Sequence, residues 1–136
     1  MRPAILYGID TRAAAEIASL TAEFGEQNIL VRAGTLLSSQ AVGPKLEWVR
    51  KHEPDLWARV RSVLLPKDYV RFRLTGERAT DVADASGTLM FDVAGRKWSS
   101  DILQAMDVKA NLLPRVYESP ETTGVLSADG ARETGL

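Results

Sequence analysis

The sequence contains no cysteine and only one histidine, His52. Without cysteine there is no disulfide framework and no thiolate metal site, and a single imidazole cannot by itself form a metal centre. This composition fits a cytoplasmic protein, which is the location we expect. His52 precedes Glu53 and Pro54 at the end of a charged stretch, where an exposed capping residue is expected rather than a general base.

Long apolar runs and an excess of one charge are also missing. No apolar run approaches the roughly 18 residues that a membrane span requires, and the first residues do not resemble a signal peptide. The formal net charge is −1, so we expect neither nucleic acid nor a membrane as a partner. With 136 residues, 45% of them hydrophobic and 26% charged, the chain can bury the core of one ordinary globular domain.

The apolar periodicity predicts an α-rich chain with a few short strands. Pro44 and Pro54 suit the first turn of a helix, and Gly25 and Gly76 are placed to end one. Helices are expected near residues 11–24, 44–52, 54–61, 67–75, 80–86, 100–107 and 127–134. Short strands are expected near residues 4–7, 63–65 and 123–126.

The residue types between positions 45 and 93 are more specific than this periodicity. Residues 45–52 read KLEWVRKH and fit at every position a signature of the form K-apolar-x-W-apolar-x-polar-[ENQH]. Residues 64–77 read LLPKDYVRFRLTGE, and residues 81–93 read DVADASGTLMFDV. Together these segments resemble the FGGY family of carbohydrate kinases, and within it the xylulokinase-like branch.

The resemblance implies the fold and the activity of a longer protein. The implied fold class is α/β, as the α-rich part of an actin-like ATPase (ribonuclease H-like) N-terminal domain, with residues 1–136 as the later part of that domain. Family members phosphorylate a hydroxyl of a ketopentose or related polyol with ATP and Mg²⁺, and their catalytic aspartate lies downstream of this region. We therefore expect no catalytic residue, no metal site and no ATP binding in this segment alone. It would supply scaffold and one wall of the sugar site, in an enzyme that could form a homo-oligomer.

Asp10 and Arg12 are the first candidate substrate-binding residues. By the resemblance they match the Asp and Arg of a W-x-D-x-R element on the substrate side of the cleft, whereas Gly8 stands where relatives have the Trp. The missing ring leaves the identity of the sugar open, and a Trp restored at position 8 is expected to sharpen the preference for xylulose. A purely structural interpretation also exists, because an Asp at a helix N-cap needs no ligand and contributes about 1 kcal/mol as a cap.

Gln40 is a further candidate, in the loop before Lys45. In relatives this loop often carries an aromatic side chain that packs against the polyol, but residues 38–43 contain none. An amide could instead hydrogen-bond a sugar hydroxyl. Lys45 and Trp48 are interpreted as structural, the first as a stem lying across the fold and the second as a core ring.

Asp84 and Ser86 complete the candidate set. Asp81 and Asp84 lie three residues apart, on one face of a short helix if Thr80 caps its start. Paired carboxylates can perform acid–base chemistry or hold Mg²⁺, but they also stabilise a helix N-terminus without any ligand. The segment with Asp84 and Ser86 is expected to form a tight turn near the cleft.

A different class of function is open at this point. The chain could be a free-standing α-rich binding or regulatory module that retains the family's packing residues without catalysis. A reading frame that continues on both sides would favour the kinase, and a natural stop after Leu136 would favour the module. The sequence specifies neither the sugar nor the oligomeric state.

Overall fold

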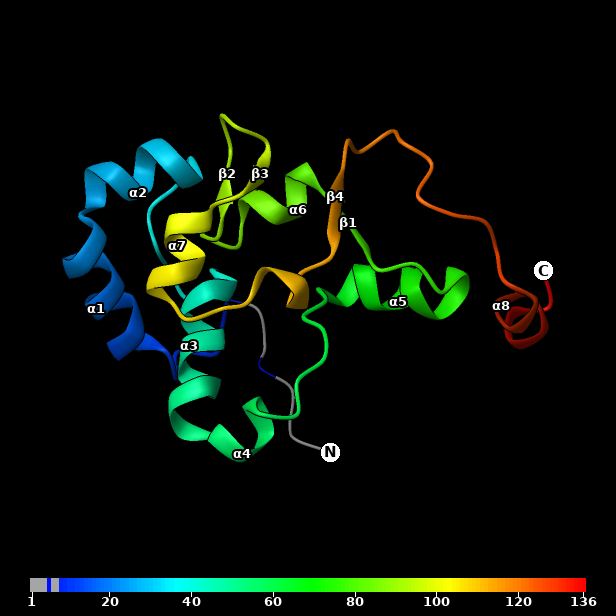
Figure 1. Cartoon of the computed structure of the whole chain (residues 1–136), viewed down its shortest axis with the longest axis horizontal. Coiled ribbons are helices and arrows are strands. Elements are labelled where there is room, and N and C mark those ends of the chain that lie inside the picture. Colours follow the sequence, from blue (N-terminus) through cyan, green and yellow to red (C-terminus); the bar gives the residue numbers. More distant parts are fainter. Residues whose placement is uncertain (1–4, 6–7) are drawn as a thin grey trace.

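The fold is built mainly from helices, with two small sheets between them (Figure 1). The structure, a computed structural model, describes residue 5 and residues 8–136. The helices are α1 (Ala14–Phe24), α2 (Glu26–Ala33), α3 (Val42–His52), α4 (Pro54–Trp57), α5 (Pro66–Thr75), α6 (Val82–Ser86), α7 (Ser100–Ala105) and α8 (Ala128–Thr134), with a 3-10 turn η1 (Ala110–Leu112). The strands are β1 (Ala79–Asp81), β2 (Phe91–Asp92), β3 (Lys97–Trp98) and β4 (Arg115–Tyr117). The predicted α-rich α/β class is confirmed.

The described part of the chain contains two sheets of two strands each. β1 pairs in parallel with β4, with Ala79 opposite Arg115. β2 and β3 form an antiparallel hairpin in which Phe91 lies opposite Trp98, and the two rings meet edge to face with their centroids 5.7 Å apart. Sequence reasoning predicted neither sheet, because strands of two or three residues are too short to show an alternating pattern.

Two predicted strands are wrong and a third cannot be compared. Residues 63–65 are extended but make no strand ladder; Val63 N donates to Leu112 O at 2.8 Å as an isolated hydrogen bond. Residues 123–126 form an irregular segment that leads to α8, and Val125 is 80% exposed (Figure 1). The strand expected at residues 4–7 lies outside the described residues except for Ile5, which is not in a strand.

One helix was missed, and the start of another is corrected. Residues 26–33 form α2, which places Ile29 and Ala33 in the core one turn apart, while the intervening Leu30 and Val31 are exposed. Gly25, with φ +77°, ends α1 as predicted and lets the chain turn directly into α2. α1 starts at Ala14 rather than residue 11, and Ala13 occupies its N-cap position.

Several helices after α3 also begin or end at other residues than predicted. α4 ends at Trp57 rather than residue 61, and α7 ends at Ala105 rather than residue 107. α6 begins at Val82, because Thr80 belongs to β1 and Asp81 is the N-cap, accepting from Asp84 N at 3.0 Å. α5 ends at Gly76 in the left-handed conformation, as predicted.

The core lies where α1, α2 and α7 meet the β2–β3 hairpin. Its fully buried side chains include Leu20 from α1, Ile29 from α2 and Ile102 from α7. Trp98 packs partly against this cluster and donates from Nε1 to Pro114 O at 2.9 Å. None of the helices in the described part of the chain has both the length and the apolar character of a membrane span.

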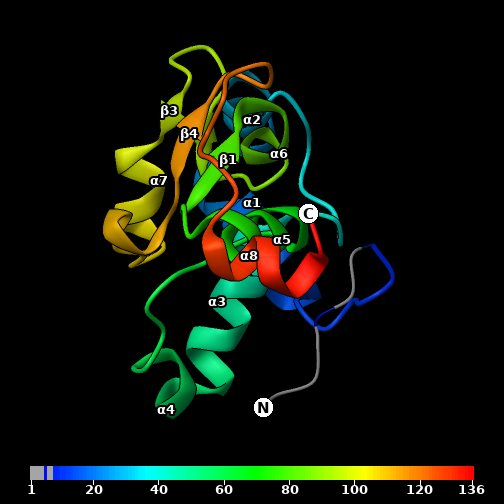
Figure 2. The ribbon, with the colours of Figure 1, turned by 90° about the vertical axis from the view of Figure 1, so that its right-hand side faces the viewer.

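α8 packs at the far end of α5, away from this core (Figures 1 and 2). Ser127 caps α8 by accepting from Gly130 N at 3.0 Å, and both its backbone N and its hydroxyl donate to Leu74 O. The contact is close, since a Cβ on Gly130 would lie 2.3 Å from Leu74 O. The α5–α8 junction therefore requires glycine at position 130.

Candidate functional site

A groove with a volume of about 700 Å³ lies between α3, the segment that enters α5, and α6. Apolar side chains line much of it, namely Ile5, Val42, Leu46, Val49, Val63, Leu64, Leu65, Pro66 and Ala83. Its polar groups come from separate parts of the chain: Gln40, Lys45, Lys67, Asp84 and Ser86. Three of the residues predicted to bind substrate, Gln40, Asp84 and Ser86, therefore line one groove.

Lys67 joins the carboxylates on the α5–α6 side of this groove. Its Nζ lies 2.6 Å from Asp81 Oδ2, 3.0 Å from Asp68 Oδ1 and 3.1 Å from Asp84 Oδ2. Arg71, one turn along α5, is 4.0 Å from both Asp68 and Asp81. We call these five residues the Lys67 cluster. Sequence reasoning did not single out Lys67, because the three acidic residues converge on it only when α5 packs against β1.

The Lys67 cluster shifts the protonation of its members in opposite directions. Burial raises the pKa of Asp81, but the hydrogen bonds from Lys67 and from the Asp84 amide outweigh it and hold that pKa below its usual range. Burial lowers the pKa of Lys67, but its contacts with Asp81, Asp68 and Asp84 raise that pKa overall. The ion pair thus keeps Asp81 ionised and Lys67 protonated over a wider pH range than either would have alone.

Asp10 and Arg12 pair with each other and do not line the groove. Asp10 Oδ1 accepts from the backbone N of Arg12 at 3.1 Å and from its Nε at 2.9 Å, and Oδ2 lies 2.8 Å from NH2. This hydrogen bond to Asp10 raises the pKa of Arg12. Asp10 makes a local turn with Arg12 instead of capping α1, so the capping interpretation is wrong.

Lys45 connects that pair to the groove. Lys45 is 8% exposed and lines the groove, in keeping with the prediction that its side-chain stem lies across the fold. Burial lowers the pKa of Lys45, while the nearby charge of Asp10 opposes the shift and Arg12 adds to it. Asp10 and Arg12 can therefore affect the groove electrostatically through Lys45 without lining it.

Trp48 is not part of the core cluster, contrary to prediction. Its ring stacks on His52, with centroids 4.6 Å apart and an angle of 13°, and the Arg12 guanidinium lies 4.9 Å from its centroid. His52 is exposed, as predicted, and its Nδ1 lies 3.0 Å from Trp48 O. Trp48 thus supports Arg12 from the side of α3.

Gly8 lies next to Gln40, with its backbone in the left-handed region at φ +75°. A Cβ there would meet Gln40 Cγ at 3.6 Å, and Gly8 O accepts from Ser39 Oγ at 2.7 Å. A side chain other than that of Asn or Asp at position 8 would add backbone strain of about 1–2 kcal/mol. Gly8→Trp would therefore change the backbone as well as the available volume, and it is not a clean test of sugar specificity.

The acidic residues of this segment do not form a metal site. Among the described residues, no group of three or more His, Cys, Asp or Glu side chains is placed to hold a metal ion. Where three carboxylates do converge, the Lys67 ammonium already lies between them. Among the described residues, these carboxylates therefore do not fit a Mg²⁺ site.

Solved structures share this fold. A xylulose kinase from Rhodospirillum rubrum matches with a TM-score of 0.93 and 30% identity, over 100% of this chain and 28% of that one. A protein described as a xyloylose kinase from Brucella ovis matches with a TM-score of 0.86 and 37% identity, over 96% of this chain and 26% of that one. The fold is that of the N-terminal domain of an actin-like sugar kinase.

The sequence comparisons make this class more specific. The model of the N-terminal domain of the FGGY family of carbohydrate kinases matches residues 1–136, so the chain belongs to this family. It is 43% identical over 136 residues to the xylulose kinase of Escherichia coli (strain K12), covering 100% of this chain and 28% of that protein. The chain thus spans little more than a quarter of the length of such curated relatives.

Proposed function

We propose that the full-length protein is an ATP-dependent sugar kinase that phosphorylates a hydroxyl of a ketopentose or related polyol, as a xylulose kinase does. Residues 1–136 would be the later part of its N-terminal domain and would form scaffold and one wall of the sugar site. The observation that carries this proposal is the groove in which Gln40, Lys45, Asp84 and Ser86 meet. The 43% identity to a xylulose kinase supports the choice of sugar.

The groove offers suitable partners for a polyhydroxylated substrate. The Asp84 carboxylate can accept hydrogen bonds from two sugar hydroxyls, and the Lys45 ammonium and Gln40 amide can donate to hydroxyl oxygens. The Ser86 hydroxyl, which already donates to Ala83 O at 2.6 Å, retains acceptor capacity. The apolar side chains between these groups can contact the C–H faces of the sugar.

The proposal assigns ATP and Mg²⁺ to the full-length protein and not to this segment alone. Bound Mg-ATP would supply the phosphoryl group and the charge that stabilises its transfer. The carboxylates of the described residues do not fit the magnesium ion, and the proposal assigns no catalytic role to any of them. Their proposed part is to bind and orient the sugar. We further propose that the protein acts in the cytoplasm, without a nucleic-acid or membrane partner.

The proposal is tested by measuring ADP formation by the full-length protein with Mg-ATP and a panel of sugars and polyols. We expect ADP release that depends on a ketopentose and exceeds the rate with glycerol or an aldopentose. ADP release that no sugar stimulates would contradict the kinase. It would favour the alternative, a non-catalytic α-rich binding or regulatory module.

A further inference from the structure

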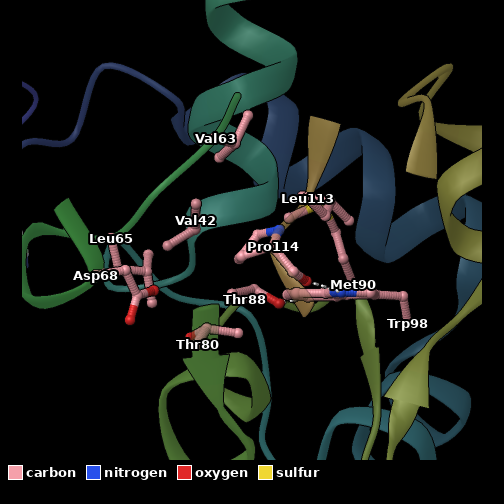
Figure 3. A pocket seen from close by; sticks show the side chains of 10 residues that line it. All are labelled: Val42, Val63, Leu65, Asp68, Thr80, Thr88, Met90, Trp98, Leu113 and Pro114. Carbon is pink, nitrogen blue, oxygen red and sulfur yellow. Dashed lines mark hydrogen bonds between the residues drawn. The ribbon is translucent and has the colours of Figure 1, made fainter. Parts of the chain in front are cut away.

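A small cavity lies next to the groove, between the start of α5, β1 and the β2–β3 hairpin (Figure 3). Its volume is about 10 Å³, close to the minimum that one water molecule requires. Most of its lining is apolar, from side chains such as Val42, Leu113 and Pro114. Asp68 and Thr80 supply polar groups to the same wall, and Figure 3 draws both at the cavity.

Asp68 and Thr80 are buried with unmet hydrogen-bonding capacity. Asp68 is 0% exposed and Thr80 is 1% exposed. The two carboxylate oxygens of Asp68 and the hydroxyl of Thr80 have no hydrogen-bond partner among the described residues. Lys67 Nζ lies 3.0 Å from Asp68 Oδ1 and compensates its charge, whereas Asp68 Oδ2 has no such contact among the described residues. Leaving such groups unsatisfied is costly, so native structures usually pair them with protein or ordered water.

The remaining polar side chain of this wall, Thr88, needs no further partner. Its hydroxyl donates to Ala85 O at 2.7 Å and accepts from Met90 N at 3.2 Å. The unmet capacity therefore belongs to Asp68 and Thr80 alone among the polar side chains that line the cavity.

We propose that this cavity holds one resident water molecule that bridges Asp68 and Thr80. The Thr80 hydroxyl donates to the water oxygen, and the water donates to an Asp68 carboxylate oxygen. A monovalent cation fits less well, because Lys67 and Arg71 already compensate the charge of Asp68, and two side chains offer too few oxygen ligands. The bridge would tie α5 to β1 at positions adjacent in sequence to Lys67 and Asp81.

The test is a crystal structure of the full-length protein at a resolution that shows ordered water, with Thr80→Val and Thr80→Ser as a matched pair. Wild type and Thr80→Ser should show one spherical density peak within hydrogen-bond distance of Asp68 and the hydroxyl. Thr80→Val, which keeps the shape of the side chain but removes the hydroxyl, should lose that peak or most of its occupancy.

Three results would overturn the proposal. The first is an empty cavity in wild type, with Thr80 bonded directly to Asp68. The second is a fully occupied water in Thr80→Val, which would show that Thr80 is not its partner. The third is an anomalous thallium peak in the cavity of crystals soaked in a thallium(I) salt, which would identify a cation site. The wild-type crystal alone decides the first and third, and none of the three depends on kinase activity.

Discussion

Lys67 is the residue on which the polar side of the groove depends. It neutralises the fully buried Asp68, it fixes Asp81 at the N-cap of α6, and it lies 3.1 Å from the Asp84 carboxylate that faces the groove. These contacts link α5, β1 and α6 through one ammonium group. Sequence reasoning did not single out this lysine, although three carboxylates of the site wall converge on it.

We expect Lys67→Met to destabilise the segment by about 1–3 kcal/mol. The loss is smaller than the roughly 3–5 kcal/mol of a fully buried pair, because part of the Lys67 side chain is in water. The measurement is the hydrogen–deuterium exchange of α5, β1 and α6 amides in the full-length protein, which should become faster. Lys67→Arg should restore part of the protection, and Lys109→Met, at an exposed lysine outside the cluster, should leave it unchanged.

The same cluster predicts how stability depends on pH. Because the pKa of Asp81 is lowered in the folded protein, its contribution is complete above the unfolded value of about 3.9 and is lost as pH falls through the folded value. Lys67 has a raised pKa, so its contribution is lost only as pH rises beyond about 10.4. Near neutral pH both contributions are complete, so these two groups do not make stability depend on pH there.

Thermal unfolding midpoints between pH 7 and pH 3 test this prediction. Asp81→Asn should unfold at a lower temperature than wild type at pH 7, and the difference should shrink towards pH 3. Asp129→Asn, at a 77% exposed side chain, is the control and should follow wild type throughout. A constant difference between Asp81→Asn and wild type over this range would exclude an ionised Asp81 as the stabilising form.

Single residues were predicted from sequence only where their role is local or carried by a family motif. His52 was correctly expected to be exposed, and Gln40, Asp84 and Ser86 were selected before the groove was known. The roles of Lys67 and Trp48 depend on neighbours distant in sequence, Asp81 for the first and Arg12 for the second. No local pattern contains that information.

At the scale of elements, the close contact between α5 and α8 depends on Gly130. Ser127 donates to Leu74 O at the end of α5, and α8 then turns back so that Gly130 faces the same carbonyl. The segment that leads to α8 is mostly exposed, and besides this junction an ion pair between Arg73 NH2 and Glu133 at 3.0 Å joins α8 to α5. The stability of α8 should therefore be sensitive to one added methyl group.

We expect Gly130→Ala to displace α8 from α5 and to cost about 1–3 kcal/mol, as overpacking does. A Cβ 2.3 Å from Leu74 O cannot be accommodated without movement of the backbone. Limited proteolysis should cleave the variant between residues 118 and 127 faster than wild type. Gly87→Ala serves as the matched control, because its φ is −74° and its Cβ would meet the nearest atom at an ordinary 3.6 Å. Equal cleavage rates in wild type and Gly130→Ala would contradict this account of the junction.

Helices with clear end signals were predicted well, and short elements were not. α3, α5 and α8 lie within about two residues of their predicted limits, since proline and glycine mark their ends. α2 was missed because its buried face holds only Ile29 and Ala33, and the apolar Leu30 and Val31 between them are exposed. The β1–β4 pair arises from tertiary contact between segments far apart in the chain.

For the whole molecule, membership of the FGGY family identifies the fold, and the groove is the proposed binding site for the sugar. The segment spans about 28% of a curated relative, so its groove would be one wall of a larger site. We expect the remainder of the full-length protein to complete the site.

The most direct test of the central claim is the steady-state kinetics of Asp84→Asn in the full-length protein, with the ketopentose and ATP varied separately. If Asp84 holds sugar hydroxyls, loss of its charge should raise KM for the sugar about tenfold, the value of a charge-assisted hydrogen bond, and leave KM for ATP unchanged. Asp55→Asn, at an exposed residue of α4 outside the groove, should change neither constant. An Asp84→Asn enzyme with the wild-type KM for the sugar, or with both KM values raised equally, would contradict the assignment of this groove to the sugar.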